Sequence, residues 1–263
     1  RLREMLPAVN AARRSEVPAS EIILGLQCGG SDAWSGITSN PALGNASDRL
    51  AALGAAVLLS ETPEIYGAEH LLYARATSPE VSAKLRARLD WWEHYTSIHG
   101  GEMDNNPSPG NKAGGLTTIL EKSLGAVAKS GTSPLVDVIE YGEPVKKPGL
   151  NFMDSPGFDP CSATGQVASG ATMIAFTTGR GSAYGCQPSP SIKLSSNTAI
   201  YERMKDDIDI DCGGIASGAA TIEQKGAEIL DYLLAVASGK HSKSEELGYG
   251  GMEFVPWQIG AVM

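Results

Sequence analysis

The segment Met173-Ile174-Ala175-Phe176-Thr177-Thr178-Gly179-Arg180-Gly181 joins an apolar run to a polar turn that contains two glycines. The run has the length and the β-branched content of a strand. Its consecutive residues are apolar, so both faces of the strand need cover, which is typical of a parallel sheet with helices on both sides. The segment therefore predicts a buried parallel strand whose carboxyl end carries polar residues.

Five other apolar runs share this character, and helical patterns lie between most of them. Strands that alternate with helices form right-handed βαβ units and a mostly parallel sheet. The predicted fold class is therefore α/β, with a mostly parallel central sheet, helices on both faces and Rossmann-like layering. The other predicted strands are residues 22–27, 56–60, 135–139, 150–153 and 192–194. The predicted helices are residues 41–53, 79–99, 116–129, 161–169, 197–205 and 221–237.

The first 20 residues differ from the remainder of the chain. The sequence starts at Arg1, in what reads as the middle of a helix over residues 1–14. We expect residues 1–20 to be a helical lead-in from an upstream region, and residues 21–263 to form one α/β domain. A hydrophobic content of 42% over 263 residues is enough for one large core.

Composition excludes some classes of partner. The net charge of -9 argues against a nucleic-acid ligand, which needs a basic surface. No apolar run approaches the roughly 20 residues of a membrane span, so we expect no membrane partner. The four cysteines form no Cys-x-x-Cys pair, and we expect free thiols in a reducing cytoplasm. They are Cys28, Cys161, Cys186 and Cys212.

Polar turns follow five of the predicted strands. In open α/β sheets, ligands bind beyond the carboxyl ends of the strands. A single polar turn often serves only to reverse the chain, but five on one edge predict a site for a polar substrate. The turns are residues 28–32, 61–64, 154–159, 178–182 and 195–197.

Two basic residues are candidates for binding an anion. Arg180 lies between two glycines, where its guanidinium is free to form a bidentate pair with a carboxylate, the alternative being a structural salt bridge. Lys112 lies in the polar loop 105–115, which leads into a helix whose N-terminus would attract an anion. The alternative for this loop is an ordinary connector. His70, which follows the second polar turn, is the one histidine that we retain as a candidate.

Several of these segments together resemble the altronate/galactarate dehydratase family. The resemblance covers nearly the whole chain, and the combined motifs are far more specific than a single glycine pattern. The matching segments are LQCGGSDA at residues 26–33, NPSPGNK at 106–112, VASG at 167–170 and FTTGRG at 176–181, with smaller matches at 69–72 and 235–240.

The resemblance implies a chemistry. Family members carry an additional small N-terminal domain, dehydrate C6 sugar acids to 2-keto-3-deoxy acids, and depend on ferrous iron or magnesium. We therefore predict a metal-dependent hydro-lyase for an altronate- or galactarate-type acid, a carbon–oxygen lyase that is inactive as this chain alone and forms a homodimer. One alternative is a lyase of the same fold for another acid, because related sulfolactate sulfo-lyases eliminate sulfite. The other is a non-catalytic domain for substrate binding and oligomerisation.

Dehydration starts with removal of a proton α to a carboxylate, and the resulting enediolate needs a metal or a cationic clamp. The candidate catalytic residues are Arg180, Lys112 and His70, and the sequence assigns no residue as the base. The candidate metal ligands are Cys28, Glu61 and Glu64, a set that favours Fe²⁺ over Mg²⁺. The alternative for Cys28 is a small buried hydrophobe. The candidates for binding substrate hydroxyls are Asn106, Ser108, Asn111, Thr178, Ser196 and Asn197.

Overall fold

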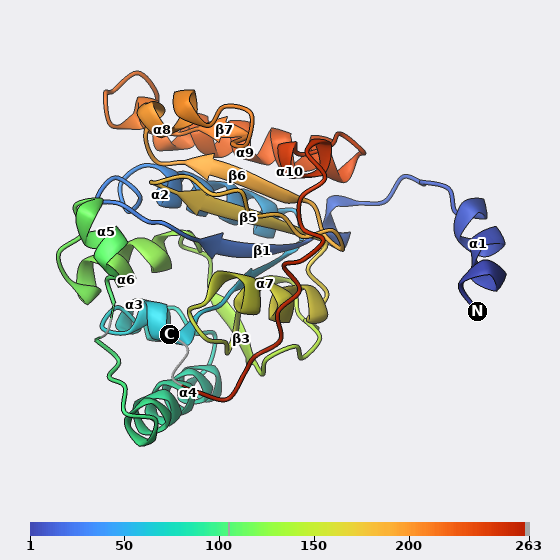
Figure 1. Cartoon of the computed structure of the whole chain (residues 1–263). Helices are drawn as coiled ribbons and strands as arrows, with labels where there is room; N and C mark the ends of the chain where they lie inside the picture. Colours follow the sequence, from blue (N-terminus) through green and yellow to red (C-terminus); the bar gives the residue numbers. More distant parts are fainter. Residues whose placement is uncertain (105, 261–263) are drawn as a thin grey trace.

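The computed structural model describes residues 1–104 and 106–260. Across these residues seven strands form one sheet in the order β3-β4-β2-β1-β5-β6-β7, and each neighbouring pair is parallel (Figure 1). The predicted α/β class is confirmed. The strands are β1 (Ile23–Cys28), β2 (Ala56–Leu59), β3 (Leu135–Ile139), β4 (Gly149–Met153), β5 (Met173–Thr178), β6 (Ser191–Ser195) and β7 (Ile210–Asp211).

Helices cover both faces of the sheet (Figure 1). On one face, α2 and α9 pack against each other and against the sheet in the largest apolar cluster. On the other face, α7 packs on β1 and on apolar side chains of β5. The helices are α1 (Leu2–Ala11), α2 (Ser39–Ala52), α3 (His70–Tyr73), α4 (Pro79–Ile98), α5 (Pro109–Ala113), α6 (Ile119–Ala128), α7 (Asp159–Ala168), α8 (Thr198–Arg203), α9 (Ile222–Ala237) and α10 (Lys243–Glu246). Short 3-10 helices are η1 (Ala19–Glu21), η2 (Thr62–Ile65) and η3 (Gly213–Ile215).

Strand β1 allows α7 to approach closely because its side chains differ on the two faces. Leu24 and Leu26 belong to the large apolar cluster. On the α7 face, a Cβ at Gly25 would lie 2.6 Å from Oε1 of Gln166. The missing side chain lets Gln166 donate hydrogen bonds to the carbonyls of Leu26 and Leu58, at 3.1 and 3.0 Å.

Two helix starts follow from capping side chains. Ser78 accepts a hydrogen bond from the amide of Val81 ahead of α4, as its Ser-Pro-Glu start predicts. The start of α6 was predicted wrongly at residue 116. The helix begins at Ile119 because the side chain of Thr118 caps the amide of Glu121. The polar loop ahead of it contains α5, a helix that was not predicted.

The chain leaves the sheet in opposite directions after its two central strands. From β1 it passes to β2 on one side, and from β5 it passes to β6 on the other, although β1 and β5 are direct neighbours. Diverging connections of this kind leave a crevice at the carboxyl ends of the two strands. The turns at residues 28–32 and 178–182 therefore meet at the place where an open α/β sheet binds its ligand.

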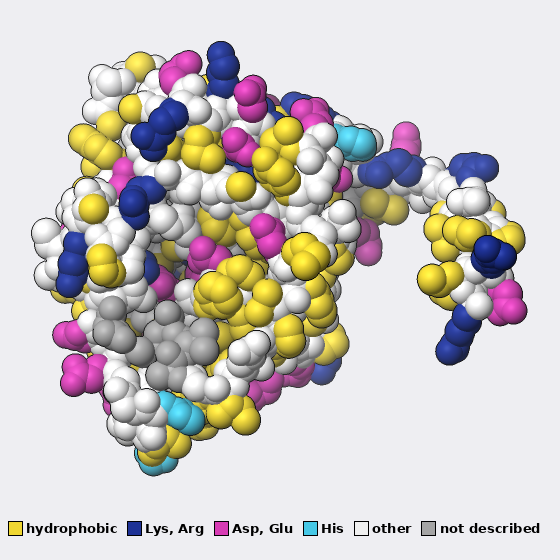
Figure 2. Space-filling model, in the orientation of Figure 1, with side chains coloured by type: hydrophobic (Ala, Val, Ile, Leu, Met, Phe, Trp, Pro, Cys, Tyr) yellow, Lys and Arg dark blue, Asp and Glu magenta, His cyan; other side chains and the backbone are white. Residues whose placement is uncertain are grey.

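The N-terminal helix α1 lies apart from the sheet domain in Figure 1. None of its residues is buried, and Leu2 and Val9 are 80% and 61% exposed. Figure 2 shows apolar and basic side chains on this projecting segment. The boundary between residues 1–20 and the α/β domain stays a prediction. Among the described helices, none has both the length and the apolar character needed to cross a membrane.

Candidate active site

A polar cleft of about 200 Å³ opens at the carboxyl edge of the sheet, at the crevice between β1 and β5. Four of the five polar turns predicted from the sequence contribute to its wall, so the prediction that they share one edge is correct. The residues that line the cleft are Cys28, Gly29, Gly30, Ser31, Glu64, Asn106, Ser108, Asn111, Lys122, Gly157, Asp159 and Arg180. Asn105, part of the predicted polar loop, lies outside the described residues.

The floor of the cleft contains a buried lysine at the end of α6. The ammonium of Lys129 donates to the sulfur of Cys28 at 3.0 Å and lies 3.5 Å from Oε2 of Glu61. Burial would lower the pKa of Lys129, but the charges of Cys28 and Glu61 outweigh it and raise that pKa. Burial also raises the pKa of the Cys28 thiol. Burial raises the pKa of Glu61 as well, so the cluster favours the charged form of Lys129 over the charged forms of its two partners.

A second lysine forms a closed triad in the wall. The ammonium of Lys122 donates to Oε1 of Glu64 and to Oδ1 of Asn106, both at 2.8 Å. The amide of Asn106 also donates to Oε1 of Glu64, at 3.0 Å. Burial works against the charge of Lys122, but Glu64 outweighs it and raises the pKa of Lys122. The triad fixes three polar side chains at the cleft.

The predicted metal ligands have other partners. A metal centre needs several converging donors, and the described residues contain no group of three or more His, Cys, Asp or Glu side chains that could hold an ion. Lysine ammoniums bond to the sulfur of Cys28 and to one carboxylate oxygen of Glu61 and of Glu64. By themselves these residues do not fit a metal. The requirement for ferrous iron stays a prediction.

Two predicted substrate-binding residues support the wall of the cleft instead of lining it. The hydroxyl of Ser196 donates to one oxygen of buried Asp32 at 2.7 Å, and the amide of Asn197 donates to the other at 3.0 Å. These bonds tie the turn after β6 to the turn after β1. Thr178 is also absent from the lining of the cleft, and its hydroxyl accepts from the amide of Gly181 at 3.0 Å in the turn that carries Arg180.

The predicted residues Ser108 and Asn111 both reach the cleft. They form the capping box of α5, in which each side chain accepts from the backbone amide of the other. The side chain of Asn111 also donates to the carbonyl of Ser31 at 2.9 Å. The loop is thereby anchored to the turn after β1, which explains why two distant segments share one cleft.

Arg180 lines the cleft with an exposed side chain. The alternative of a structural salt bridge is not observed, because none of the ion pairs among the described residues includes Arg180. A guanidinium in this position is available to a ligand carboxylate.

The other two candidate catalytic residues lie outside the cleft. Lys112 follows Asn111 on α5, and successive helical residues point about 100° apart, so the turn that directs Asn111 inward leaves Lys112 exposed. His70 is the first residue of α3 and is also exposed. Neither contributes to the cleft lining. Lys122 of α6 is the lysine that reaches it.

Asp159 was not among the candidates, although it lines the cleft. It is the first residue of α7, and its carboxylate lies over Gly29, where a Cβ would overlap with Oδ2. Burial and the neighbouring charge of Glu64 raise the pKa of Asp159 to about 7. The sequence signal was an Asp-Pro helix start, which is usual at helix N-termini and indicates no function by itself.

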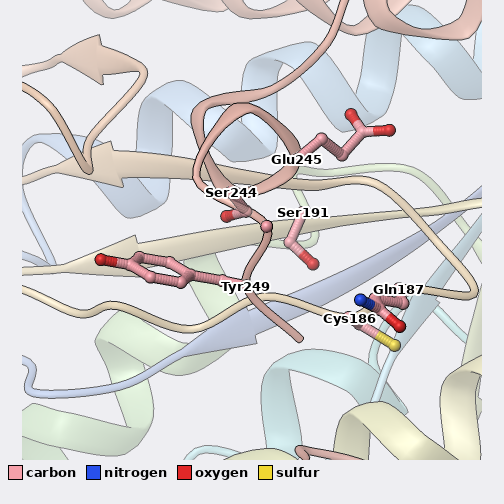
Figure 3. Close-up of a pocket in the computed structure, with 7 residues that line it drawn as sticks. Cys186, Gln187, Ser191, Ser244, Glu245 and Tyr249 are labelled. Carbon is pink, nitrogen blue, oxygen red and sulfur yellow. The ribbon is translucent and has the colours of Figure 1, made fainter. Parts of the chain in front are cut away.

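A second pocket, of about 140 Å³, lies near α10 (Figure 3). It includes Ser191, the first residue of β6, so it lies at the amino edge of the sheet. Its one charged side chain is that of Glu245, and no lysine or arginine lines it, so it offers no cation to an acidic ligand. The cleft at the carboxyl edge is therefore the stronger candidate site.

Fold and cleft together define an α/β protein with a polar site, lined by two cationic and two acidic side chains, at the switch point of a parallel sheet. The family described as D-galactarate/Altronate dehydratase, C-terminal, matches residues 19–262, and the chain belongs to this family.

Three named relatives agree with the family assignment. Galactarate dehydratase (L-threo-forming) of Escherichia coli K12 is 46% identical over 235 residues, 89% of this chain and 45% of the relative. Altronate dehydratase of Bacillus subtilis 168 is 40% identical over 247 residues, 93% of this chain and 50% of the relative. The beta subunit of (2R)-sulfolactate sulfo-lyase from Chromohalobacter salexigens is 35% identical over 256 residues, 96% of this chain and 65% of the relative. The chain thus spans about half the length of the two dehydratases.

Proposed function

We propose that the whole protein is a hydro-lyase that removes water from a C6 sugar acid of the altronate or galactarate type and releases a 2-keto-3-deoxy acid. This chain would supply the cleft in which the elimination takes place. The observation that carries the proposal is that two cationic side chains line one cleft at the switch point of the sheet. They are Arg180, which forms no ion pair among the described residues, and Lys122, which belongs to the triad with Glu64 and Asn106. The dehydratase relatives support the substrate class.

The charges of the cleft suit the first step of such an elimination. When the proton α to the carboxylate leaves, negative charge develops on the carboxylate oxygens, and fixed cations aimed at them stabilise the enediolate. Arg180 would bind the carboxylate with two parallel hydrogen bonds. Lys122 and the buried Lys129 would add positive potential from the wall and the floor.

Hydroxyl recognition would use the uncharged polar side chains that line the cleft beside the cations. Asn106 uses one amide hydrogen on Glu64, which leaves its second amide hydrogen for a substrate oxygen. Ser31 and Ser108 also line the cleft. A substrate with several hydroxyl groups is therefore a better match than an unsubstituted short acid.

A sulfo-lyase is the second candidate function, because one relative is named for sulfolactate. It needs the same removal of a proton α to a carboxylate, followed by departure of sulfite in place of water. The third possibility, a domain that only binds substrate and oligomerises, predicts binding of sugar acids without turnover.

One assay separates the three. The whole protein, at the length at which it is made in the cell, is incubated anaerobically with ferrous iron and either altronate, galactarate or sulfolactate. We expect release of a 2-keto-3-deoxy acid from one of the two sugar acids. Sulfite release from sulfolactate alone would favour the second function, and calorimetric binding with no product would favour the third.

A further inference from the structure

Asp159 differs from the other acids around the cleft, because among the described residues no other side chain forms a hydrogen bond or ion pair with it. Glu64 holds Lys122 and Asn106, Glu61 faces Lys129, and Asp32 accepts from Ser196 and Asn197. For Asp159, the described part of the chain provides neither a side-chain hydrogen bond nor an ion pair. We propose that Asp159 is the base that removes the α proton of the sugar acid, an inference that rests on the function proposed above.

The position of Asp159 fits this role. Its carboxylate lies over Gly29, whose missing side chain leaves room for it at the carboxyl end of β1. It lines the same cleft of about 200 Å³ as Arg180. A ligand whose carboxylate binds Arg180 therefore has its α carbon within a cleft that also contains the carboxylate of Asp159. A base needs this proximity before its acidity matters.

The surroundings of Asp159 also suit a base that works near neutral pH. The facing charged groups are Glu64 of η2, Glu61 ahead of it, and Lys122 and Lys129 of the α6 segment. Burial and the charge of Glu64 raise the pKa of Asp159 to about 7, and the two lysines oppose this shift. By contrast, Glu64 is held in an ion pair 2.8 Å from Lys122. Environments that distinguish two carboxyl groups in one site are typical of acid–base catalysis.

Asp159 can both accept the proton and return it, so the reaction needs no other proton donor. The carboxylate of Asp159 takes the proton of the α C–H bond, and the electron pair of that bond enters the enediolate. The electrons then form the double bond between the α and β carbons while the β C–O bond breaks. The β oxygen leaves as water with the proton held by Asp159, which is ionised again. The enol tautomerises to the 2-keto-3-deoxy acid.

The test uses the whole protein with the sugar acid that the wild type dehydrates. We expect Asp159→Asn to lower kcat by about 10²- to 10⁴-fold, the usual contribution of a general base, with KM changed by less than about threefold. The rate at which the α hydrogen of the substrate exchanges with deuterium from deuterium oxide should fall by the same factor as kcat. The matched control is Asp231→Asn on the exposed face of α9, for which we expect wild-type kinetics.

Chemical rescue separates a base from a structural residue. Sodium formate at about 100 mM should raise kcat of Asp159→Ala at least about tenfold above its value without formate. Sodium chloride at the same concentration should leave kcat of this variant unchanged. A structural role would leave formate without effect. The inference is overturned if Asp159→Asn keeps kcat within threefold of wild type, or if formate rescue and the exchange defect are both absent. A wild type that dehydrates no sugar acid overturns the proposed function itself, before any variant is assayed.

Discussion

The ammonium of Lys129 lies 3.0 Å from the sulfur of Cys28, beneath the candidate active site, and both side chains are buried. The same ammonium faces Glu61 at 3.5 Å. Lysine thus provides the positive charge at a place where sequence reasoning predicted a metal ion. Because a buried charge without a partner is costly, the three side chains depend on one another.

Removing the lysine charge should destabilise the fold. Lys129→Met keeps most of the side-chain volume but leaves Glu61 without its cation, so we expect the free energy of unfolding to fall by about 3–5 kcal/mol. Urea denaturation followed by circular dichroism measures it. The control is Lys147→Met, which removes a half-exposed ion pair to Asp137 and should change stability by about 1 kcal/mol or less.

The double variant Lys129→Met/Glu61→Gln gives a second check. It removes both charges, so it should recover part of the free energy of unfolding that Lys129→Met loses. A single variant within about 1 kcal/mol of wild type would contradict the view that Lys129 balances the buried acid.

Arg180 should matter for catalysis and not for stability. Arg180→Lys keeps the charge but loses the planar pair of donors, and we expect kcat/KM of the whole protein for its sugar acid to fall by about 10- to 100-fold. Because the side chain is exposed, the melting temperature should stay unchanged. Steady-state kinetics beside Arg203→Lys, on the exposed end of α8, provide the comparison. Unchanged kinetics would remove Arg180 from the site.

The fold was largely predictable because its strands are continuous apolar runs. All six predicted runs are strands of the sheet. The seventh strand, Ile210–Asp211, is too short to produce a periodic signal. Helix α5 gives no helical signal in the sequence because its five residues contain proline and glycine, and its capping box is visible only once Ser108 and Asn111 face each other.

The site was predictable only in part, because its pairs are distant in sequence. Arg180, Asn106 and the turn at Cys28 were recognised from local glycine and polar patterns. Lys122 and Lys129 were not, since they meet Glu64 and Glu61 across 58 and 68 positions and carry no local motif. Lys112, by contrast, was a candidate but does not line the cleft. Its position beside a motif in the sequence does not decide which side of a short helix it occupies.

Substitution of Cys28 tests the metal prediction directly. Because its sulfur is bonded to Lys129, we expect Cys28→Ser to leave the iron content of the anaerobically purified whole protein unchanged. Iron is measured by mass spectrometry, with Cys186→Ser at the amino edge of the sheet as the control. A loss of iron specific to Cys28→Ser would instead make the sulfur a ligand in the whole protein.

The raised pKa of Asp159 leads to a pH dependence of stability that needs no substrate. In the unfolded chain an aspartate has a pKa of about 3.9, whereas in the folded protein the pKa of Asp159 is raised to about 7. Between these values the folded state holds a proton that the unfolded state lacks. The stability contributed by this group is therefore fully present below about pH 4 and is lost as the pH rises through about 7.

Asparagine cannot ionise, so Asp159→Asn should escape this loss. We expect the variant to become more stable relative to wild type as the pH rises from 4.5 to 8, in urea titrations at constant ionic strength. The charge of Asp159 also raises the pKa of buried Glu61, so its removal in the variant relieves this repulsion at higher pH and adds to the difference in the same direction. Asp231→Asn should show a difference from wild type that does not change with pH. If the stability difference between Asp159→Asn and wild type is the same at both pH values, the carboxyl group of Asp159 titrates normally and is solvated in the folded protein.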